Sequence, residues 1–440
     1  MTRKNKDDLE NHVIKGKKIK NPFHFLNETF DFIDAQTVKR HIFYLILASI
    51  VAKLIVIFVT TTVFHSFVDY FDIGIYLKHT AMLVQGQMPY DGEFGYPILI
   101  FIPLVIAFIP ALIVQNAMAF VYSFQLIMVL CDIVTALCVY LIGLKIWEEK
   151  TAFYSGLIYT ASFSAAYFVI TKYDAFPTVL MMLGITFIVY GENLKGYAAS
   201  VLGFFTKVFP IITLPYFILY NAKESSLKQE IIKAVGIGIP LSLLLFVPLF
   251  LAKQDTLNMY IPIRSELGFY SNTVTFTIYS WIHDVFKAGI SIESISLFMY
   301  LVMFIGLLIL AYIGYKAPKK DTRLLVKLLL SSVVLLVVCA RVRSPQYIVW
   351  FTPLICILAA DELKKTVSLF AFQTMAYIEF PLMFGAFYVA NSYTNPVLSS
   401  GWVLTLLAFT LEYLALFVCL WLVIDPKGLY QKLQNGQSLY

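Results

Sequence analysis

Long apolar runs recur along most of the chain and constrain its fold more than any other feature. Each run is about 20 residues long, the length that an α-helix needs to cross the hydrocarbon core of a membrane. Of the 440 residues, 60% are hydrophobic and 14% are charged, whereas about a quarter of a soluble domain is charged. A transmembrane barrel would alternate apolar and polar residues instead. We therefore predict an all-α, polytopic helical membrane protein.

Short basic loops between the runs set the predicted topology, because Lys- and Arg-rich loops stay on the cytoplasmic side. These loops are 145–150, 192–195, 221–233, 315–323, 361–365 and 425–432. Residues 1–42, which are polar, Lys-rich and partly amphipathic, are predicted to be a cytoplasmic tail. Alternation from there gives about 12 spans of membrane-crossing length, with both termini inside. The expected parts are a module at 43–360 and C-terminal helices with a short tail at 361–440.

Two apolar runs conflict with this alternation. Residues 96–114 have no basic loop to follow them and contain three prolines, so we expect helices that lie in the outer interface. They belong to a large first outer loop, 64–117, and a second long outer loop is expected at 252–292. Residues 197–220 lie between two basic loops, so we expect two half-height helices that split at Lys207–Pro210. This places Lys207 either at an outer turn or deep in a cavity that opens to the outer side.

The net charge, the cysteines and the histidines give no indication of nucleic-acid binding, of disulfides or of a metal site. The net charge of +6 is explained by the cytoplasmic loops, so no nucleic-acid partner is predicted. All five cysteines lie inside apolar runs and are interpreted as small core residues rather than as a disulfide framework. No metal site is predicted, because His65 and His79 have no third ligand at a suitable spacing. An activating divalent cation near Asp69 and Asp72 is the alternative.

The predicted topology gathers unusual ionisable residues on the outer face. Ionisable groups at or inside the bilayer boundary are costly and are functional candidates by default. They are His65, Asp69, Asp72, Glu93, Lys172, Asp174, Lys207, Arg264, Glu266, Arg341 and Arg343. A set that mixes carboxylates with cations suits an anionic ligand whose chemistry also needs a base.

Four blocks on this face resemble a known superfamily. They are "DIGIYLKHTAMLVQGQMPYDGEFGYP" (72–97), "KYDAFP" (172–177), "GFFTKVFP" (203–210) and "RVRSPQYIVWFTPL" (341–354). Together they resemble the GT-C glycosyltransferases that use polyprenyl-phosphate sugars. The bacterial phosphatidylinositol-mannoside α-mannosyltransferases are the most similar, and the first mannosyltransferase of eukaryotic GPI anchors is similar in its "SPQY" and "PY" elements. The chain departs from the pattern at Asp69-x-x-Asp72, where the GPI enzyme has Asp-x-Asp, and at Ile98, where the family has proline.

The resemblance implies an inverting transfer of a hexose, most often mannose, from a polyprenyl- or dolichyl-phosphate donor to a hydroxyl of a lipid or glycan acceptor. Asp72 fills the position of the catalytic base, supported by the acids Asp69, Asp174 and Glu93. Lys207, Arg341 and Arg343 are expected to bind the donor phosphate. The expected sugar or acceptor contacts are Tyr76, Tyr90, Arg264, Glu266, Tyr270, Gln346 and Tyr347. The site would face outward from the plasma membrane, among membrane lipids and without a cofactor.

Each assignment has a structural alternative. Asp72 and Asp174 stand where helix N-caps are expected, and Arg341 and Arg343 could anchor lipid headgroups. Asp132 is interpreted as a hydrogen-bonding residue between helices. At the level of function, a transporter or flippase for an anionic lipid-linked substrate would use the same outer cations, although its polar residues should reach both faces. A ligase for lipid-linked glycans is a third possibility.

Overall fold

The computed structural model describes residues 35–63, 69–88, 90, 94–252, 254 and 268–426. The chain divides into two units, Met1–Arg40 and His41–Tyr440. The first unit is represented only by the beginning of helix α2, so the fold below is that of the second. In the described ranges the strands are β1 (Tyr388–Val389) and β2 (Ser392–Tyr393), which pair as one antiparallel hairpin. Helices make up nearly all other regular structure, which confirms the all-α prediction.

Among the described residues, six helices are long and apolar enough to cross a bilayer. They are α2 (Ala35–Phe58) with its π-helical extension η1 (Val59–Val63), α5 (Ala117–Gly143), α11 (Leu227–Leu251), α14 (Ile292–Lys316), α15 (Thr322–Cys339) and α18 (Ser400–Ile424). A seventh candidate is the pair α6 (Glu149–Thr160) and α7 (Phe163–Thr171), which is bent by 56°. The protein is therefore a multi-pass membrane protein.

The bend between α6 and α7 differs from the prediction of one continuous span at 152–171. Ser162 lies at the break, and its hydroxyl donates to the carbonyl of Ile158 at 2.9 Å. A serine that bonds to the carbonyl four residues earlier competes with the helical ladder and favours a bend. Ser162 carries no strong sequence signal for a break, because serine also occurs within straight helices.

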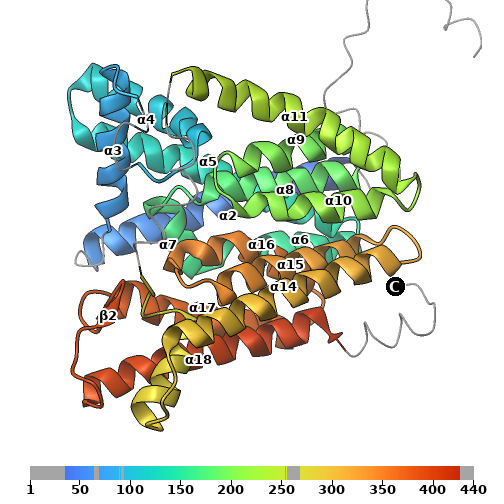
Figure 1. Ribbon diagram of the computed structural model, residues 1–440. Coiled ribbons are helices and arrows are strands. Elements are labelled where there is room, and N and C mark those ends of the chain that lie inside the picture. The colour runs from blue at the N-terminus through green and yellow to red at the C-terminus, as the bar shows by residue number, and fades with distance from the viewer. Residues whose placement is uncertain are drawn as a thin grey trace, which may run out of the picture. The chain divides into compact units, whose positions relative to one another are not determined.

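Shorter helices complete the bundle. They are α8 (Ala175–Val189), α9 (Asn193–Phe204), η4 (Phe209–Ile212), α10 (Thr213–Asn221), α13 (Val274–Tyr279), η6 (Ser280–Val285), η7 (Pro345–Tyr347), α16 (Ile348–Ala359), α17 (Leu363–Tyr377) and η8 (Ile378–Met383). In Figure 1, α8 to α11 lie side by side, and α14 to α18 form a neighbouring group. The break between α9 and η4 confirms the predicted split of residues 197–220 at Lys207–Pro210.

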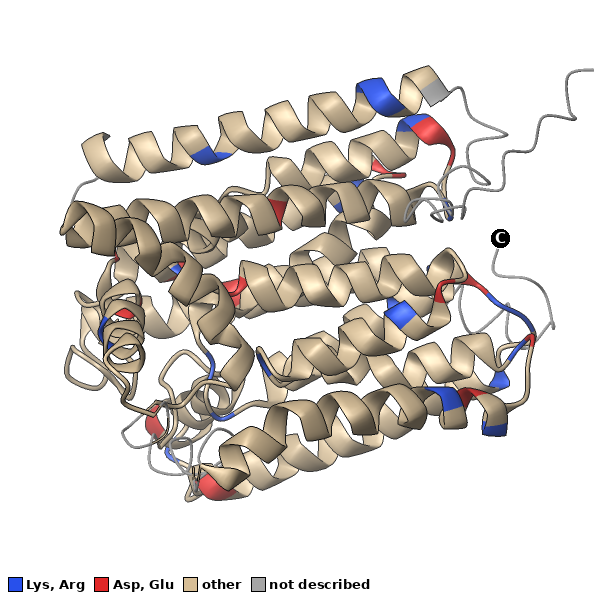
Figure 2. Cartoon of the chain, turned by 90° about the horizontal axis from the view of Figure 1, so that it is seen from above, with Lys and Arg blue, Asp and Glu red and all other residues tan. Residues whose placement is uncertain are grey.

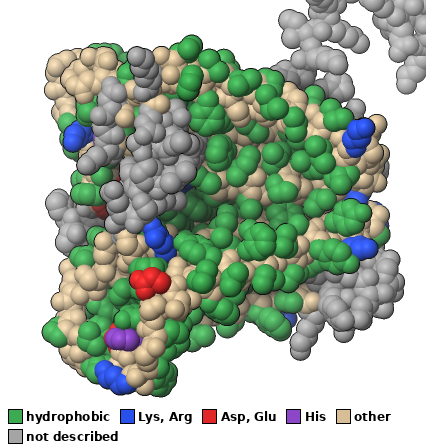
Figure 3. Space-filling model, in the orientation of Figure 1, with side chains coloured by type: hydrophobic (Ala, Val, Ile, Leu, Met, Phe, Trp, Pro, Cys, Tyr) green, Lys and Arg blue, Asp and Glu red, His purple; other side chains and the backbone are tan. Residues whose placement is uncertain are grey.

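The core of the bundle centres on α15 and α16. Every residue of α16 is buried, whereas α11 and α14 expose most of their apolar side chains, such as Leu244 and Phe304. Figure 3 shows apolar side chains over the middle of one face, with basic residues mainly at its edges. Apolar surface this extensive is unfavourable in water and is what a bilayer would cover.

The segment between α2 and α5, which the sequence predicts to be the first outer loop, contains α3 (Phe71–Val84), η3 (Ile98–Ile100) and α4 (Phe101–Val114). The 14 residues of α4 extend about 21 Å at 1.5 Å per residue, which is less than the roughly 30 Å of a hydrocarbon core. The helix buries Leu104 and Ala107 and exposes Ile106 and Ile113. It packs on α3 and α5. Together with η3 it forms an apolar helix over Ile98–Val114, which is shorter than the six candidate spans.

Charged residues gather mostly near the helix ends (Figure 2). A buried exception joins α2, α5 and α6: the Lys53 ammonium lies 2.6 Å from a carboxylate oxygen of Asp132. Ser49 and Tyr159 also donate hydrogen bonds to this carboxylate, at 2.9 and 2.7 Å. Asp132 therefore links three helices, as predicted, and gains a cationic partner that the sequence pattern did not indicate.

Candidate functional site

A cavity of about 370 Å³ collects residues from segments far apart in the sequence. Its charged and polar wall includes Asp69, Asp72, Lys172, Tyr270, Arg343 and Gln346. Three phenylalanines, Phe71, Phe380 and Phe384, contribute an apolar side. Five residues that the sequence nominated for the site are thus brought to one place, from the start of α3 to the "SPQY" turn before α16.

The start of α3 places its two acids in different roles. Asp69 Oδ1 accepts the backbone N–H of Phe71 at 3.0 Å, so Asp69 satisfies one of the free amides at the helix start. Asp72 lies in the first turn, where the helix dipole favours a negative charge. The alternative reading of Asp72 as the N-cap residue is wrong, because Asp72 lies inside α3 and Tyr70 occupies the N-cap position.

Lys172 joins the two acids. Its ammonium lies 2.6 Å from Asp69 Oδ2 and 2.9 Å from Asp72 Oδ2, and its side chain is 7% exposed. Burial alone would lower the pKa of Lys172, but Asp72 and Asp69 outweigh it and raise the pKa above its usual value. The cation is therefore charged at neutral pH. The sequence placed Lys172 on the outer face without giving it a role, and its position in "KYDAFP" was the available signal.

A second ion pair lies two residues further along the chain. Lys207, in the turn between α9 and η4, contacts Asp174 Oδ1 at 2.6 Å, and the same oxygen accepts the indole N–H of Trp350 at 2.6 Å. Asp174 occupies the N-cap position of α8, as the alternative expected, but its side chain makes no capping bond to that helix. Lys207 also lies 4.7 to 5.1 Å from the ring centres of Tyr173, Tyr347 and Trp350. Lys207 is outside the described cavity wall.

A cluster of three tyrosines packs between the two ion pairs. The rings of Tyr76, Tyr96 and Tyr173 contact one another edge to face, at 5.3 to 5.9 Å between centres. Tyr76 is fully buried, and Tyr90 is nearly so, with its hydroxyl donating to the Tyr96 carbonyl at 2.9 Å. These two predicted sugar contacts are therefore part of the packing of the segment between α2 and α5, and neither lines the cavity.

Arg343 is held from several directions at the cavity wall. Its guanidinium pairs with Glu412, lies 3.6 Å from Glu379, and donates to the Asn272 carbonyl and the Tyr413 hydroxyl at 3.1 Å. Burial would lower the pKa of Arg343, but the neighbouring acids and Tyr413 raise it well above its usual value. Arg343 thus lines the cavity, and the carboxylates of Glu379 and Glu412 already balance its positive charge.

Arg341, the other arginine of the block 341–354, does not line the cavity. The backbone carbonyl of Arg341 accepts the N–H of Tyr270 at 2.9 Å. This bond connects the loop before α13 to the loop before α16. Tyr270 lines the cavity, whereas Arg341 lies outside its described wall. Binding of a phosphate by either arginine stays a prediction.

The β1–β2 hairpin covers one side of the cavity and is fastened by buried polar bonds. Ser271 bonds through its N–H and its hydroxyl to the carbonyls of Ala390 and Val389, at 2.8 and 2.7 Å. Glu379 Oε1 accepts from Asn272 at 2.7 Å and from the Tyr388 hydroxyl at 2.6 Å. The hairpin is therefore attached to the same acid that faces Arg343.

Replacing Tyr388 by phenylalanine should loosen this attachment. The change removes a buried hydrogen bond to a carboxylate and keeps the ring, so we expect a loss of about 1.5–3 kcal/mol in the free energy of unfolding. Titration of the detergent-solubilised protein with SDS measures it. The control is Tyr122→Phe on the exposed face of α5, which should change little. Equal effects from the two variants would contradict the importance of the Tyr388 bond.

Three predicted site residues, Glu93, Arg264 and Glu266, lie outside the described residues. Tyr347 stacks on Trp350 with 3.9 Å between ring centres, and Gln346 lines the cavity. Within the described part of the chain, no three His, Cys, Asp or Glu residues are grouped closely enough to hold a metal ion.

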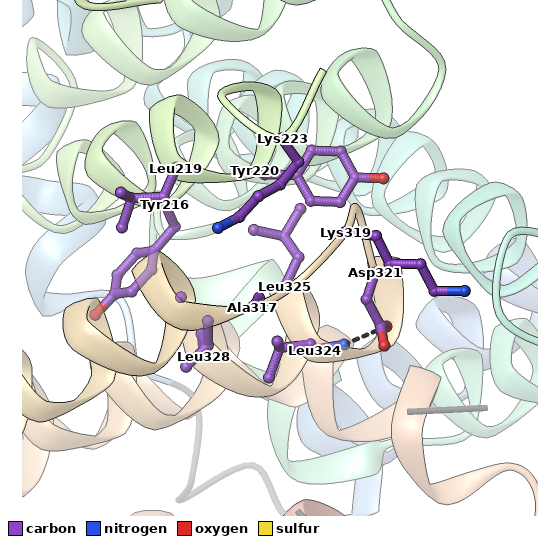
Figure 4. A pocket seen from close by; sticks show the side chains of 11 residues that line it. Tyr216, Leu219, Tyr220, Lys223, Ala317, Lys319, Asp321, Leu324, Leu325 and Leu328 are labelled. Carbon is purple, nitrogen blue, oxygen red and sulfur yellow. Dashed lines mark hydrogen bonds between the residues drawn. The ribbon is translucent and has the colours of Figure 1, made fainter. Parts of the chain in front are cut away.

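A second hollow lies between α10 and the connection from α14 to α15 (Figure 4). Tyr216, Lys223 and Leu328 are among its lining residues, and Asp321 accepts the N–H of Leu324 at 2.9 Å. Its volume of about 20 Å³ has room for roughly one water molecule. This hollow is too small for a sugar or a phosphate, so the cavity lined by Asp69, Asp72 and Lys172 is the candidate site.

No protein-family model matches the sequence, and no curated protein sequence matches it either.

Proposed function

We propose that the chain is an integral-membrane, inverting glycosyltransferase of the GT-C type. It moves a hexose, with mannose as the first candidate, from a polyprenyl- or dolichyl-phosphate donor to a hydroxyl of a lipid or glycan acceptor. The observation that carries the proposal is the cavity at which Asp69, Asp72, Lys172 and Arg343 meet. Asp72 offers a proton acceptor there, and the ammonium of Lys172 beside it offers a contact for a phosphate.

The proposed reaction needs one base. The acceptor hydroxyl gives its proton to Asp72 as its oxygen bonds to the anomeric carbon. The bond between that carbon and the phosphate oxygen breaks, and the electron pair leaves with the phosphate. Attack opposite the leaving group inverts the anomeric centre. Glycosidases differ, because they use two carboxylates at a fixed separation.

The proposed topology has about 12 transmembrane helices in the plasma membrane, with both termini in the cytoplasm. It is supported by the position of the basic loops, which connect the helices at the ends opposite to Lys172 and Asp174. The cavity would then face outward. A donor phosphate at headgroup depth could enter it without crossing the bilayer.

An apolar groove gives the donor's hydrocarbon chain a place to lie. It has a volume of about 480 Å³ and is lined by residues of α9, η4, α10 and α11 that are apolar apart from Ser242. Phe204 and Ile211, on either side of the turn that holds Lys207, belong to its wall. An isoprenoid chain would replace the membrane lipid that otherwise covers this surface.

A panel of radiolabelled polyprenyl-phosphate sugars tests the proposal. Purified protein is incubated with each donor and a membrane lipid extract, and the products are separated from the donor. We expect label from one donor to appear in a new glycolipid or glycan. Recovery of all label on the original donors, with folded protein and a complete extract, would overturn the proposed activity.

A further inference from the structure

Lys172 differs from the other cations of the candidate site in the partners that it has. Arg343 is held by two acids, a backbone carbonyl and a hydroxyl. Lys207 is paired with Asp174 and surrounded by three aromatic rings, outside the described cavity wall. Lys172 lines the cavity, and its described partners are Asp69 and Asp72 alone. An ammonium has three donors, so a third N–H can be offered to a ligand.

The contact with Lys172 also affects what Asp72 can do. The ammonium lies 2.9 Å from Asp72 Oδ2, and its positive charge repels a proton that arrives at the same carboxylate. The shorter contact, 2.6 Å, is with Asp69. Asp69 can therefore keep the ammonium in place while the contact with Asp72 is exchanged for another anion.

We propose that Lys172 binds the donor phosphate and, in doing so, exchanges Asp72 for the phosphate while it keeps Asp69. This inference rests on the proposed function. Lysine is a common phosphate ligand because its ammonium acts as a compact point charge. The exchange frees Asp72 to take the acceptor's proton only when a donor is bound. As the bond from the sugar to the phosphate breaks, the phosphate oxygen takes the electron pair, and Lys172 stays protonated beside it.

The test measures binding of a polyprenyl monophosphate that carries no sugar. Lys172→Met alone would leave two acids together, so the main variant is Lys172→Met combined with Asp69→Asn. Relative to the wild type it loses one positive and one negative charge, which keeps the local net charge unchanged. Its matched control is Asp69→Asn alone. Both are compared in detergent micelles, with the phosphate-free polyprenol as the second ligand.

We expect the double variant to bind polyprenyl monophosphate about 10- to 100-fold more weakly than Asp69→Asn, which is the effect of one lost charged hydrogen bond. Polyprenol should bind equally to both, and Lys172→Arg should keep most of the phosphate affinity. Equal binding of the monophosphate by the double variant and its control would overturn the role of Lys172. That result leaves the proposed function intact if the wild type transfers sugar, whereas a wild type that neither binds the monophosphate nor transfers sugar overturns both.

Discussion

Asp72→Asn should reduce sugar transfer by about 10²- to 10⁴-fold, which is the usual contribution of a general base. An amide has nearly the shape of the carboxylate but cannot accept the acceptor's proton. The fold should survive, because Lys172 keeps its shorter contact with Asp69. The measurement is the initial rate of transfer at saturating donor, together with a melting curve of the purified variant.

The matched control for this prediction is Asp69→Asn. Asparagine at position 69 keeps an oxygen that can accept the N–H of Phe71. We expect this variant to lose far less activity than Asp72→Asn. Full activity of Asp72→Asn would rule out Asp72 as the base, and an equal loss in both variants would show that the two acids act as one unit.

Lys207→Met should lower the free energy of unfolding by about 3–5 kcal/mol, because it leaves a buried carboxylate without its cation. Asp174 is fully buried, and among the described residues its Oδ2 has no hydrogen-bond partner. The remaining donor to the carboxylate would be the indole of Trp350. SDS titration of the detergent-solubilised protein measures the change.

The double variant Lys207→Met with Asp174→Asn separates two roles of Lys207. Neutralising both partners removes the uncompensated charge, so the double variant should be more stable than Lys207→Met alone. If the double variant regains no stability, the ion pair is not the source of the loss. If it is stable but binds the donor normally, Lys207 supports the site, whereas a selective loss of donor binding would show the phosphate contact expected from the sequence.

The sequence was sufficient to predict the class of fold, an all-α protein with several helices long and apolar enough to cross a membrane. The thickness of the hydrocarbon core sets the length of an apolar run that can cross it. The preference of Lys and Arg for the cytoplasmic side predicts where the basic loops lie. The split at Lys207–Pro210 followed from the same rules and is confirmed. The bend at Ser162 was not predicted, because it depends on a side-chain bond to Ile158 that has no distinct sequence pattern.

The site was predicted less completely, since charge and position do not say which partner a residue has. The sequence placed Asp72, Arg343 and Gln346 on one face, and they share one cavity. It could not show that Arg343 pairs with Glu412, a residue inside an apolar run far along the chain. For the same reason Lys172 had no assigned role, although it is the residue that joins Asp69 to Asp72.

Reconstitution into liposomes tests the central claim most directly, because it separates chemistry from transport. The vesicles contain a polyprenyl-phosphate sugar labelled in the sugar, together with the acceptor lipids. The account predicts that label leaves the polyprenyl phosphate and appears in a product of different composition, and that Asp72→Asn prevents this. Label that stays on the original donor while the donor moves to the opposite leaflet would contradict the enzyme and identify a transporter.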